Sequence, residues 1–205
     1  MKVLLINGSP HEKGCTYTAL KEVEKALNEN GVQTEIYWVG NKPVSGCLGC
    51  AKCRELGKCV LGDKVNDFAL KAAEADGFVF GSPVHYAHAG GTITAFMDRL
   101  FYSGGKYLAY KPAAAIASSR RAGGPATFDM LNKYFTISNM PVVSSNYWND
   151  VHGNTPEEVL KDEEGLQTMR ILGNNMAWLL KCIALGKEQG LEPKKEVKIR
   201  TNFIK

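Results

Sequence analysis

The sequence predicts an α/β protein built on one doubly wound parallel sheet. Short apolar runs of strand length alternate along the 205 residues with stretches in which apolar side chains recur at helical spacing. The first run, residues 2–7, is apolar almost throughout, as expected for a strand buried on both faces. Because right-handed crossovers join successive parallel strands, helices must cover both faces of the sheet. With 44% hydrophobic residues, the chain can form a single domain over residues 1–205.

Five strands are expected, each an apolar or β-branched run bounded by Gly, Ser, Pro or Asp. They are predicted at residues 2–7, 34–39, 76–84, 111–119 and 140–145. Ligands of such sheets bind at the carboxyl ends of the strands, where the strand order reverses. The loops that follow the first, third, fourth and fifth strands are therefore the predicted functional edge.

Five helices alternate with these strands. Apolar side chains at three-to-four spacing place them around residues 17–27, 63–75, 89–101, 128–135 and 166–183. Gly31 stands where a glycine ends the first helix, and Asp63 is the expected N-cap of the second. Cys182 falls in an apolar stretch of the last helix, and we expect an inert thiol in the core there.

Composition and charge exclude several classes of function. The formal net charge of +4 comes from 25 basic and 21 acidic residues scattered along the chain, so no nucleic-acid surface is predicted. The apolar run at residues 2–7 is too short for a signal peptide or a membrane span. We therefore expect a cytoplasmic protein without membrane contact, whose clustered thiols bind metal or do redox chemistry rather than form structural disulfides.

The loop at residues 8–16 follows the first strand and opens a helix, so it predicts an anion site. A Walker A loop has four residues between its glycines, whereas five separate Gly8 from Gly14, and no dinucleotide fingerprint is present. The loop is instead rich in hydroxyl groups, which suit a terminal monophosphate such as that of FMN. The alternative is that Ser9 belongs to a plain turn and Thr16 to a helix cap.

The later loops supply groups for a flat ring. His85 and Tyr86 follow the third strand and are predicted to flank the ring, and Arg120 and Arg121 follow the fourth strand, where positive charge can stabilise a reduced flavin. After the fifth strand, an aromatic and histidine group is expected on the same rim: Tyr147, Trp148 and His152. The alternative for each of these residues is a solvated side chain or a contact between subunits.

Three segments together resemble the flavodoxin-like NAD(P)H-dependent FMN reductase family: "GSPHEKGCTYTAL", "GSPVHYAHAGGTITAFMDRL" and the glycine-containing loop after the fourth strand. The resemblance implies a five-stranded parallel sheet in the order 2-1-3-4-5, bound FMN, NAD(P)H as transient reductant, and a homodimer or homotetramer. It places four residues around the FMN phosphate: Ser9, Cys15, Thr16 and Tyr17. It places nine around the ring: Pro83, Val84, His85, Tyr86, Ala87, Ser118, Ser119, Arg120 and Gly123. The family usually has asparagine where this chain has Cys15.

A cysteine-rich insertion occupies residues 40–62. Its thiols are spaced C-x2-C-x2-C-x5-C, at Cys47, Cys50, Cys53 and Cys59. Glycines between them allow the positive φ angles that a tightly wrapped loop needs. This compact spacing favours a cuboidal iron–sulfur cluster over zinc, for which two separated C-x2-C arms are more usual. Zinc and free thiols remain alternatives.

On this fold, the cysteine motif looks like that of the iron–sulfur flavoproteins, whose 4Fe-4S cluster passes electrons to FMN. The resemblance implies an FMN-dependent oxidoreductase that moves electrons from NAD(P)H or a reduced ferredoxin to a small-molecule or protein acceptor. No side chain is expected to act as a catalytic nucleophile, because the flavin performs the chemistry. The alternatives are an iron–sulfur electron carrier without turnover, and a thiol or metal redox sensor.

Overall fold

The computed structural model describes residues 1–199, 201 and 203; the rest of the predicted domain, including Arg200 of the basic C-terminal segment, lies outside the described residues. Five parallel strands form one sheet in the order β2-β1-β3-β5-β6, and β4 adds an antiparallel hairpin to β3. The strands are β1 Lys2–Asn7, β2 Gln33–Trp38, β3 Gly77–His85, β4 His88–Ala89, β5 Ala113–Ser119 and β6 Asp150–His152. The predicted α/β class and strand order are confirmed.

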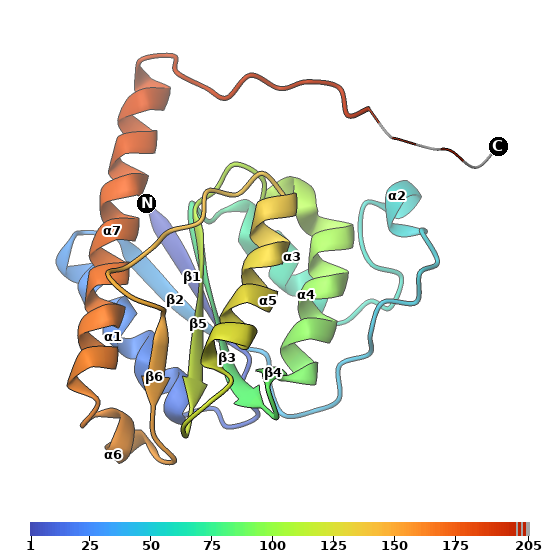
Figure 1. Ribbon diagram of the computed structural model, residues 1–205. Coiled ribbons are helices and arrows are strands. Elements are labelled where there is room, and N and C mark those ends of the chain that lie inside the picture. The colour runs from blue at the N-terminus through green and yellow to red at the C-terminus, as the bar shows by residue number, and fades with distance from the viewer. Residues whose placement is uncertain (200, 202, 204–205) are drawn as a thin grey trace.

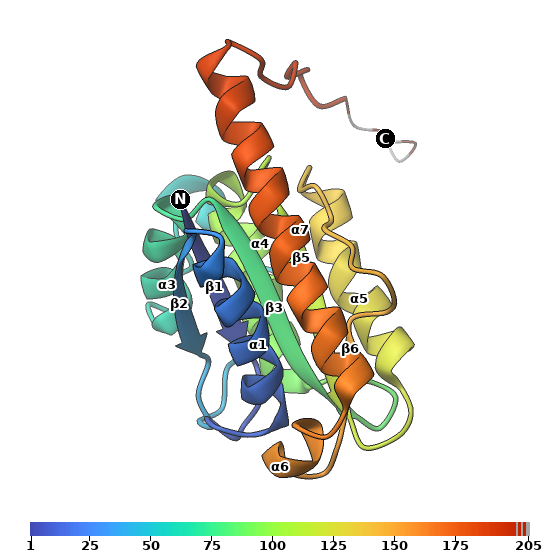
Figure 2. The ribbon, with the colours of Figure 1, turned by 90° about the vertical axis from the view of Figure 1, so that its left-hand side faces the viewer.

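Helices cover both faces of the sheet, as Figures 1 and 2 show. One face carries α1 Cys15–Glu29 and α7 Glu163–Glu188, and the other carries α3 Lys64–Ala73, α4 Gly91–Gly104 and α5 Gly124–Ile137. Three short helices complete the described chain: α2 Cys53–Leu56, η1 Gly105–Tyr107 and α6 Pro156–Val159. None of the helices in the described residues combines the length and apolar character needed to cross a bilayer.

The sheet separates two hydrophobic cores, and β1, which lies between β2 and β3, contributes to both. Its side chains alternate across the sheet, so Leu4 and Ile6 join the core under α3 and α4, and Val3 and Leu5 join the core under α1 and α7. All four are fully buried. The continuous apolar run in the sequence is explained by this burial on both faces.

The helix ends follow the predicted local chemistry. Asp63 caps α3 by accepting a hydrogen bond from the Val65 N–H at 3.2 Å. Gly31 follows the end of α1 with φ at +78°, a conformation that glycine adopts without strain.

Helices α1 and α7 lie side by side on their face of the sheet (Figure 2). Their close approach depends on Gly173 of α7. A Cβ atom at this position would lie 2.7 Å from the Ala26 Cβ and 2.9 Å from the Val23 carbonyl oxygen. The glycine that weakens the helical pattern in the sequence is therefore a packing requirement.

Two sequence predictions are wrong. Residues 140–145 form only an isolated bridge between Val142 and Ala113, and the fifth strand is β6, further along the chain. The ladder stops after Val143, because the side chain of Asn149 donates to the Ala115 carbonyl oxygen at 3.0 Å, in place of a main-chain group.

The second error concerns Cys182, which is exposed rather than buried in the core. The buried positions of α7 end at Leu180, and the helix then projects past the sheet, as Figures 1 and 2 show. An apolar helical stretch predicts burial only where another layer lies beneath it.

Candidate functional site

The carboxyl ends of β1, β3 and β5 meet at one edge of the sheet, the lower edge in Figure 1. The loops that follow them contact one another closely. The Gly8 N–H donates to the Gly81 carbonyl oxygen at 2.9 Å, and a Cβ at Gly8 would lie 2.6 Å from the Ile93 Cβ. Only glycine permits this approach, which ties the first loop to the end of β3 and the start of α4.

The first loop is held in place by a buried residue, Asn7, at the end of β1. Its Oδ1 accepts from the Ser9 N–H at 3.0 Å, and its Nδ2 donates to the Glu12 carbonyl oxygen at 2.9 Å. From β2, the Trp38 indole donates to the Ser9 carbonyl oxygen at 2.8 Å. Sequence reasoning missed Asn7, although a polar residue that ends an otherwise apolar strand is a signal for such a role.

The N-terminus of α1 lies at this edge, directly after the first loop. Its N-cap is Gly14, which has no side chain to occupy the N–H groups of Cys15, Thr16 and Tyr17 in the first turn. Free N–H donors at the positive end of a helix are the groups that an anion site uses. The buried Thr16 hydroxyl lies 2.8 Å from the Ser118 hydroxyl, so the first loop also contacts the loop after β5.

The Cys15 thiol donates to the Gly153 carbonyl oxygen at 3.6 Å. Burial raises the pKa of the Cys15 thiol, so the group is neutral at pH 7. Its backbone N–H remains the group that can contact an anion.

The β3–β4 hairpin and the loop after β5 face each other. Gly123 has φ at +89°, and a Cβ there would lie 2.7 Å from the Val84 Cγ1 and 3.2 Å from the Ala87 Cα. Of the predicted ring residues on the hairpin, Pro83 and Val84 are half-buried, whereas His85, Tyr86 and Ala87 are exposed. Tyr86 stands at the tip with φ at +58°, a conformation unusual for a bulky residue.

The loop after β5 divides into a buried and an exposed half. Ser118 and Ser119 are buried, and the Ser119 hydroxyl lies 3.1 Å from the His152 Nδ1 on β6. Arg120 and Arg121 are exposed. The structure thus brings the loops of the predicted FMN residues to one edge, but it gives the two arginines no fixed position against a ring.

A cavity of about 230 Å³ lies beside this edge. Its lining includes Arg121, Tyr147, Trp148, Asp150 and His152, so the aromatic and histidine group predicted for the rim is assembled there. The Tyr147 and Trp148 rings lie with their centroids 5.0 Å apart. Burial raises the pKa of Asp150 to about 6, and its Oδ1 has no hydrogen-bond partner in the described part of the chain.

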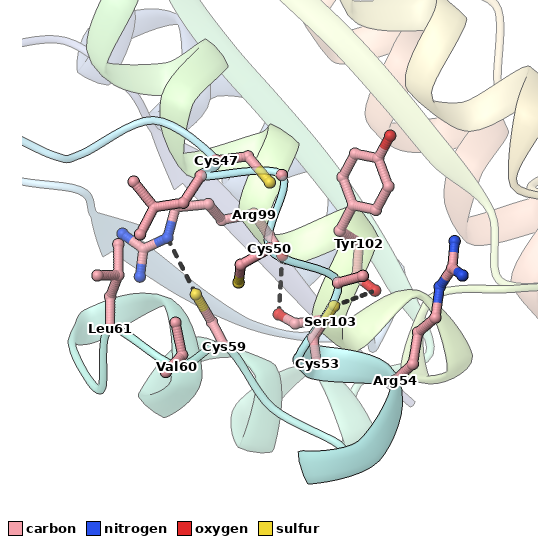
Figure 3. Close-up of a pocket in the computed structure, with 13 residues that line it drawn as sticks. Cys47, Cys50, Cys53, Arg54, Cys59, Val60, Leu61, Arg99, Tyr102 and Ser103 are labelled. Atoms are coloured by element: carbon pink, nitrogen blue, oxygen red, sulfur yellow. Dashed lines mark hydrogen bonds between the residues drawn. The ribbon is translucent and has the colours of Figure 1, made fainter.

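The four clustered cysteines surround a separate cavity of about 400 Å³, between the insertion and the C-terminal half of α4 (Figure 3). All four are free thiols. The Cys53 thiol donates to the Tyr102 carbonyl oxygen at 3.8 Å, and the Cys59 sulfur accepts from the Arg99 Nε at 3.3 Å. No three His, Cys, Asp or Glu side chains within residues 1–199, 201 and 203 converge tightly enough to hold a metal ion.

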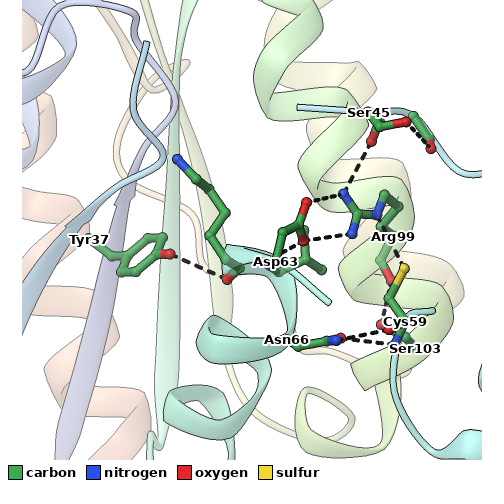
Figure 4. Close-up of polar contacts among 10 residues, drawn as sticks. Tyr37, Ser45, Cys59, Asp63, Asn66, Arg99 and Ser103 are labelled. Carbon is green, nitrogen blue, oxygen red and sulfur yellow. Dashed lines mark hydrogen bonds and ion pairs between the residues drawn. The ribbon is translucent and has the colours of Figure 1, made fainter. Parts of the chain in front are cut away.

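A charged side chain at the wall of this thiol cavity was missed by sequence reasoning. Arg99 of α4 is 1% exposed and pairs with both carboxylate oxygens of Asp63, at 2.8 and 2.6 Å (Figure 4). The hydrogen bonds from Arg99 hold the pKa of Asp63 below its usual value. The sequence signal is an arginine within the mostly apolar stretch "AFMDRLF", where a buried helix rarely includes one without a partner.

A family model described as NADPH-dependent FMN reductase matches residues 1–155. The chain belongs to this family. An iron-sulfur flavoprotein of Methanocaldococcus jannaschii is 35% identical over 191 residues, which cover 89% of this chain and 99% of that protein. An iron-sulfur flavoprotein of Methanosarcina thermophila is 25% identical over 194 residues, covering 92% of this chain and all of that protein.

The same fold occurs in a solved archaeal flavodoxin. It superposes with a TM-score of 0.62 at 15% identity and covers 88% of this chain and 99% of that one. Membership in the FMN reductase family, together with this fold, confirms the flavodoxin-like FMN oxidoreductase class that the motifs predicted.

The residues present fit both groups that the family and its relatives imply. The uncapped first turn of α1 leaves backbone N–H donors for a phosphate, and the glycine-mediated contacts bring the loops predicted to hold a flat ring to the same edge. The donor set around the second cavity is four thiols, which is the ligand chemistry of a 4Fe-4S cluster.

Proposed function

We propose that this chain is an iron–sulfur flavoprotein that moves electrons through FMN at the sheet edge and a 4Fe-4S cluster in the thiol cavity. The observation that carries the proposal is that a member of the FMN reductase family has four free thiols around one cavity. The names of the relatives from M. jannaschii and M. thermophila agree with this. When bound, FMN supplies two-electron chemistry and the cluster one-electron chemistry.

The FMN phosphate is assigned to the N-terminus of α1. The backbone N–H groups of Cys15, Thr16 and Tyr17 bind it there, with the Ser9 loop held against it by Asn7. The ring lies against two segments, 83–87 and 118–123, whose contact through Gly123 fixes the spacing between them. Neutral donors dominate these loops, so binding relies on hydrogen bonds and on the helix end rather than on paired lysines or arginines.

The cluster is assigned to Cys47, Cys50, Cys53 and Cys59. Cys47 and Cys50 lie in an exposed part of the insertion, and Cys53 and Cys59 are half-buried against α4. An exposed insertion can adjust its backbone when ligands are recruited, which suits assembly of the cluster after the domain has folded.

The electron donor is NAD(P)H or a reduced ferredoxin, and the acceptor is a small molecule or a protein. A homodimer or homotetramer is the expected assembly. Two aromatic side chains at the functional edge, Tyr86 and Trp148, are exposed in the single chain and are candidates for contact with a partner or a second copy.

Anaerobic stopped-flow spectroscopy tests this function. Protein purified without oxygen should contain FMN, iron and acid-labile sulfide, and its flavin band should bleach on mixing with NADPH or NADH. Reduction by ferredoxin alone, without bleaching by either nicotinamide, would identify an electron carrier rather than an enzyme. A colourless protein would favour a thiol or metal sensor.

A further inference from the structure

Arg99 is the one charged side chain that is buried among residues 1–199, 201 and 203. It reaches the thiol cavity from α4, and its Nε lies 3.3 Å from the Cys59 sulfur (Figure 4). Burial of a guanidinium costs free energy unless every N–H finds a partner. The groups around the Arg99 guanidinium therefore indicate the role of its positive charge.

The two terminal nitrogens of Arg99 are already occupied. They bind Asp63 at 2.8 and 2.6 Å, and Nη1 also lies 3.4 Å from the Ser45 carbonyl oxygen. Asp63 is itself fixed, because it caps α3 through the Val65 N–H. A bidentate pair sets the plane of the guanidinium, so the Nε–H points at one acceptor only, the sulfur of Cys59.

The main chain of Cys59 is also fixed in place by hydrogen bonds. Both main-chain groups of Cys59 are bonded to the Asn66 amide, at 2.9 Å for the N–H and 2.8 Å for the carbonyl (Figure 4). Asn66 belongs to α3, and Arg99 belongs to α4. Among the four clustered cysteines, Cys59 is thus the one that residues of both α3 and α4 hold in place. It is also the cysteine that follows the longest gap of the motif.

A neutral thiol is a weak hydrogen-bond acceptor, so it repays little of the cost of burying the guanidinium. A metal-bound thiolate carries negative charge and is a strong acceptor for an N–H. Hydrogen bonds and net charge at the sulfurs set the reduction potential of an iron–sulfur cluster. A fixed donor at one ligand favours the reduced state, because the reduced cluster holds one more electron.

We infer that Arg99 is a positioning residue for the cluster: through its Nε–H bond to the Cys59 sulfur it raises the cluster's reduction potential. This inference rests on the proposed function. It goes further by assigning to one non-ligand residue the control of how readily the cluster accepts an electron. The Asp63 carboxylate and the Ser45 carbonyl serve to aim the donor.

The test compares Arg99→Lys with Ser103→Ala in anaerobically purified protein. Lysine keeps a positive charge that can pair with Asp63, but its single nitrogen cannot stand at the Nη and Nε positions of the guanidinium at the same time. The Ser103 hydroxyl donates to the Arg99 main-chain carbonyl at 2.7 Å and lines the same cavity, so its removal leaves the Nε–sulfur bond intact. Iron, sulfide and FMN contents are measured first, and the cluster potential is then titrated by EPR.

At the wild-type midpoint potential, we expect the ratio of reduced to oxidised cluster to be about tenfold lower in Arg99→Lys than in the wild type. This corresponds to a lower midpoint potential by about 59 mV for one electron. Ser103→Ala should keep the wild-type potential. Loss of iron from Arg99→Lys alone, with FMN content and melting temperature unchanged, would also support a positioning role. An unchanged potential in Arg99→Lys, or equal iron loss in both variants, would overturn the inference. Wild-type protein without iron would instead overturn the proposed function itself.

Discussion

At the scale of single residues, Asp150 is half-buried and has a carboxylate oxygen without a hydrogen-bond partner in the described part of the chain. Burial raises its pKa to about 6, above the value of about 3.9 in an unfolded chain. The folded protein therefore binds more protons than the unfolded chain between these values. The stabilising contribution of the protonated carboxyl is present below pH 4 and is lost as the pH rises to 6.

Asp150→Asn should remove this pH dependence. Between pH 4 and pH 7 the variant should gain about 1–2 kcal/mol of unfolding free energy relative to the wild type, less than the full linkage value because the carboxyl retains some solvent contact. Urea unfolding at both pH values measures the difference. Parallel pH profiles for the two proteins would show that Asp150 is charged in the folded state.

Gly123 fixes the contact between the two predicted ring loops. Gly123→Ala places a Cβ at a positive φ and 2.7 Å from the Val84 Cγ1, so we expect a loss of about 1–3 kcal/mol of stability and weaker FMN retention. Gly105→Ala is the matched control, because no atom lies within 4 Å of its added Cβ and its φ is negative. Differential scanning calorimetry and the FMN content after dialysis separate the two variants. Equal retention would contradict the role given to Gly123.

Sequence reasoning found the residues whose type is informative by itself and missed those whose role depends on a partner. Glycines, hydroxyls and cysteines at characteristic spacings identified the loops. Asn7 and Arg99 were missed because their roles depend on contacts with residues distant in the sequence, or on the path of the loop around them. A buried polar residue is explained only when its hydrogen-bond partners are known.

At the scale of elements, the packing of α7 against α1 predicts stability changes of opposite sign for two glycine substitutions in α7. Gly173→Ala should destabilise the protein by about 1–2 kcal/mol, because its Cβ would collide with Ala26 and the Val23 carbonyl, and the gain in helix propensity offsets only part of this. Gly186→Ala should stabilise by up to about 1 kcal/mol, since its nearest neighbour would lie 3.8 Å away.

Chemical denaturation of the two variants under identical conditions measures both effects. Stabilisation by Gly173→Ala would mean that α1 and α7 are further apart in solution than the close contact described above.

Helices and strands could be predicted where residue types and spacing within the element itself determine them. Helix caps at Asp63 and Gly31, and the alternation of strands with helices, follow from residue types and spacing. The fifth strand was not predictable, because the side chain of Asn149 replaces a main-chain group in the ladder. The exposure of Cys182 depends on how far α7 extends beyond the sheet, which no local pattern encodes.

At the scale of the whole molecule, the FMN edge and the thiol cavity are built from different residues and can be separated by mutation. Cys50→Ala should lose iron and acid-labile sulfide while keeping FMN, because Cys50 lines only the thiol cavity. Cys182→Ala removes an exposed cysteine on α7 and should keep both. Metal analysis with absorption spectra checks the pair, and iron loss from Cys182→Ala would contradict the assignment of the cluster.

We propose above that the sheet edge binds FMN with its phosphate at the N-terminus of α1. The most direct measurement is calorimetric titration of flavin-free protein with FMN and with riboflavin, which lacks the phosphate. Hydrogen bonds to a charged group contribute about 1.5–3 kcal/mol each, so FMN should bind at least about 100-fold more tightly than riboflavin. Equal affinity for the two flavins, or no binding of FMN, would contradict the account.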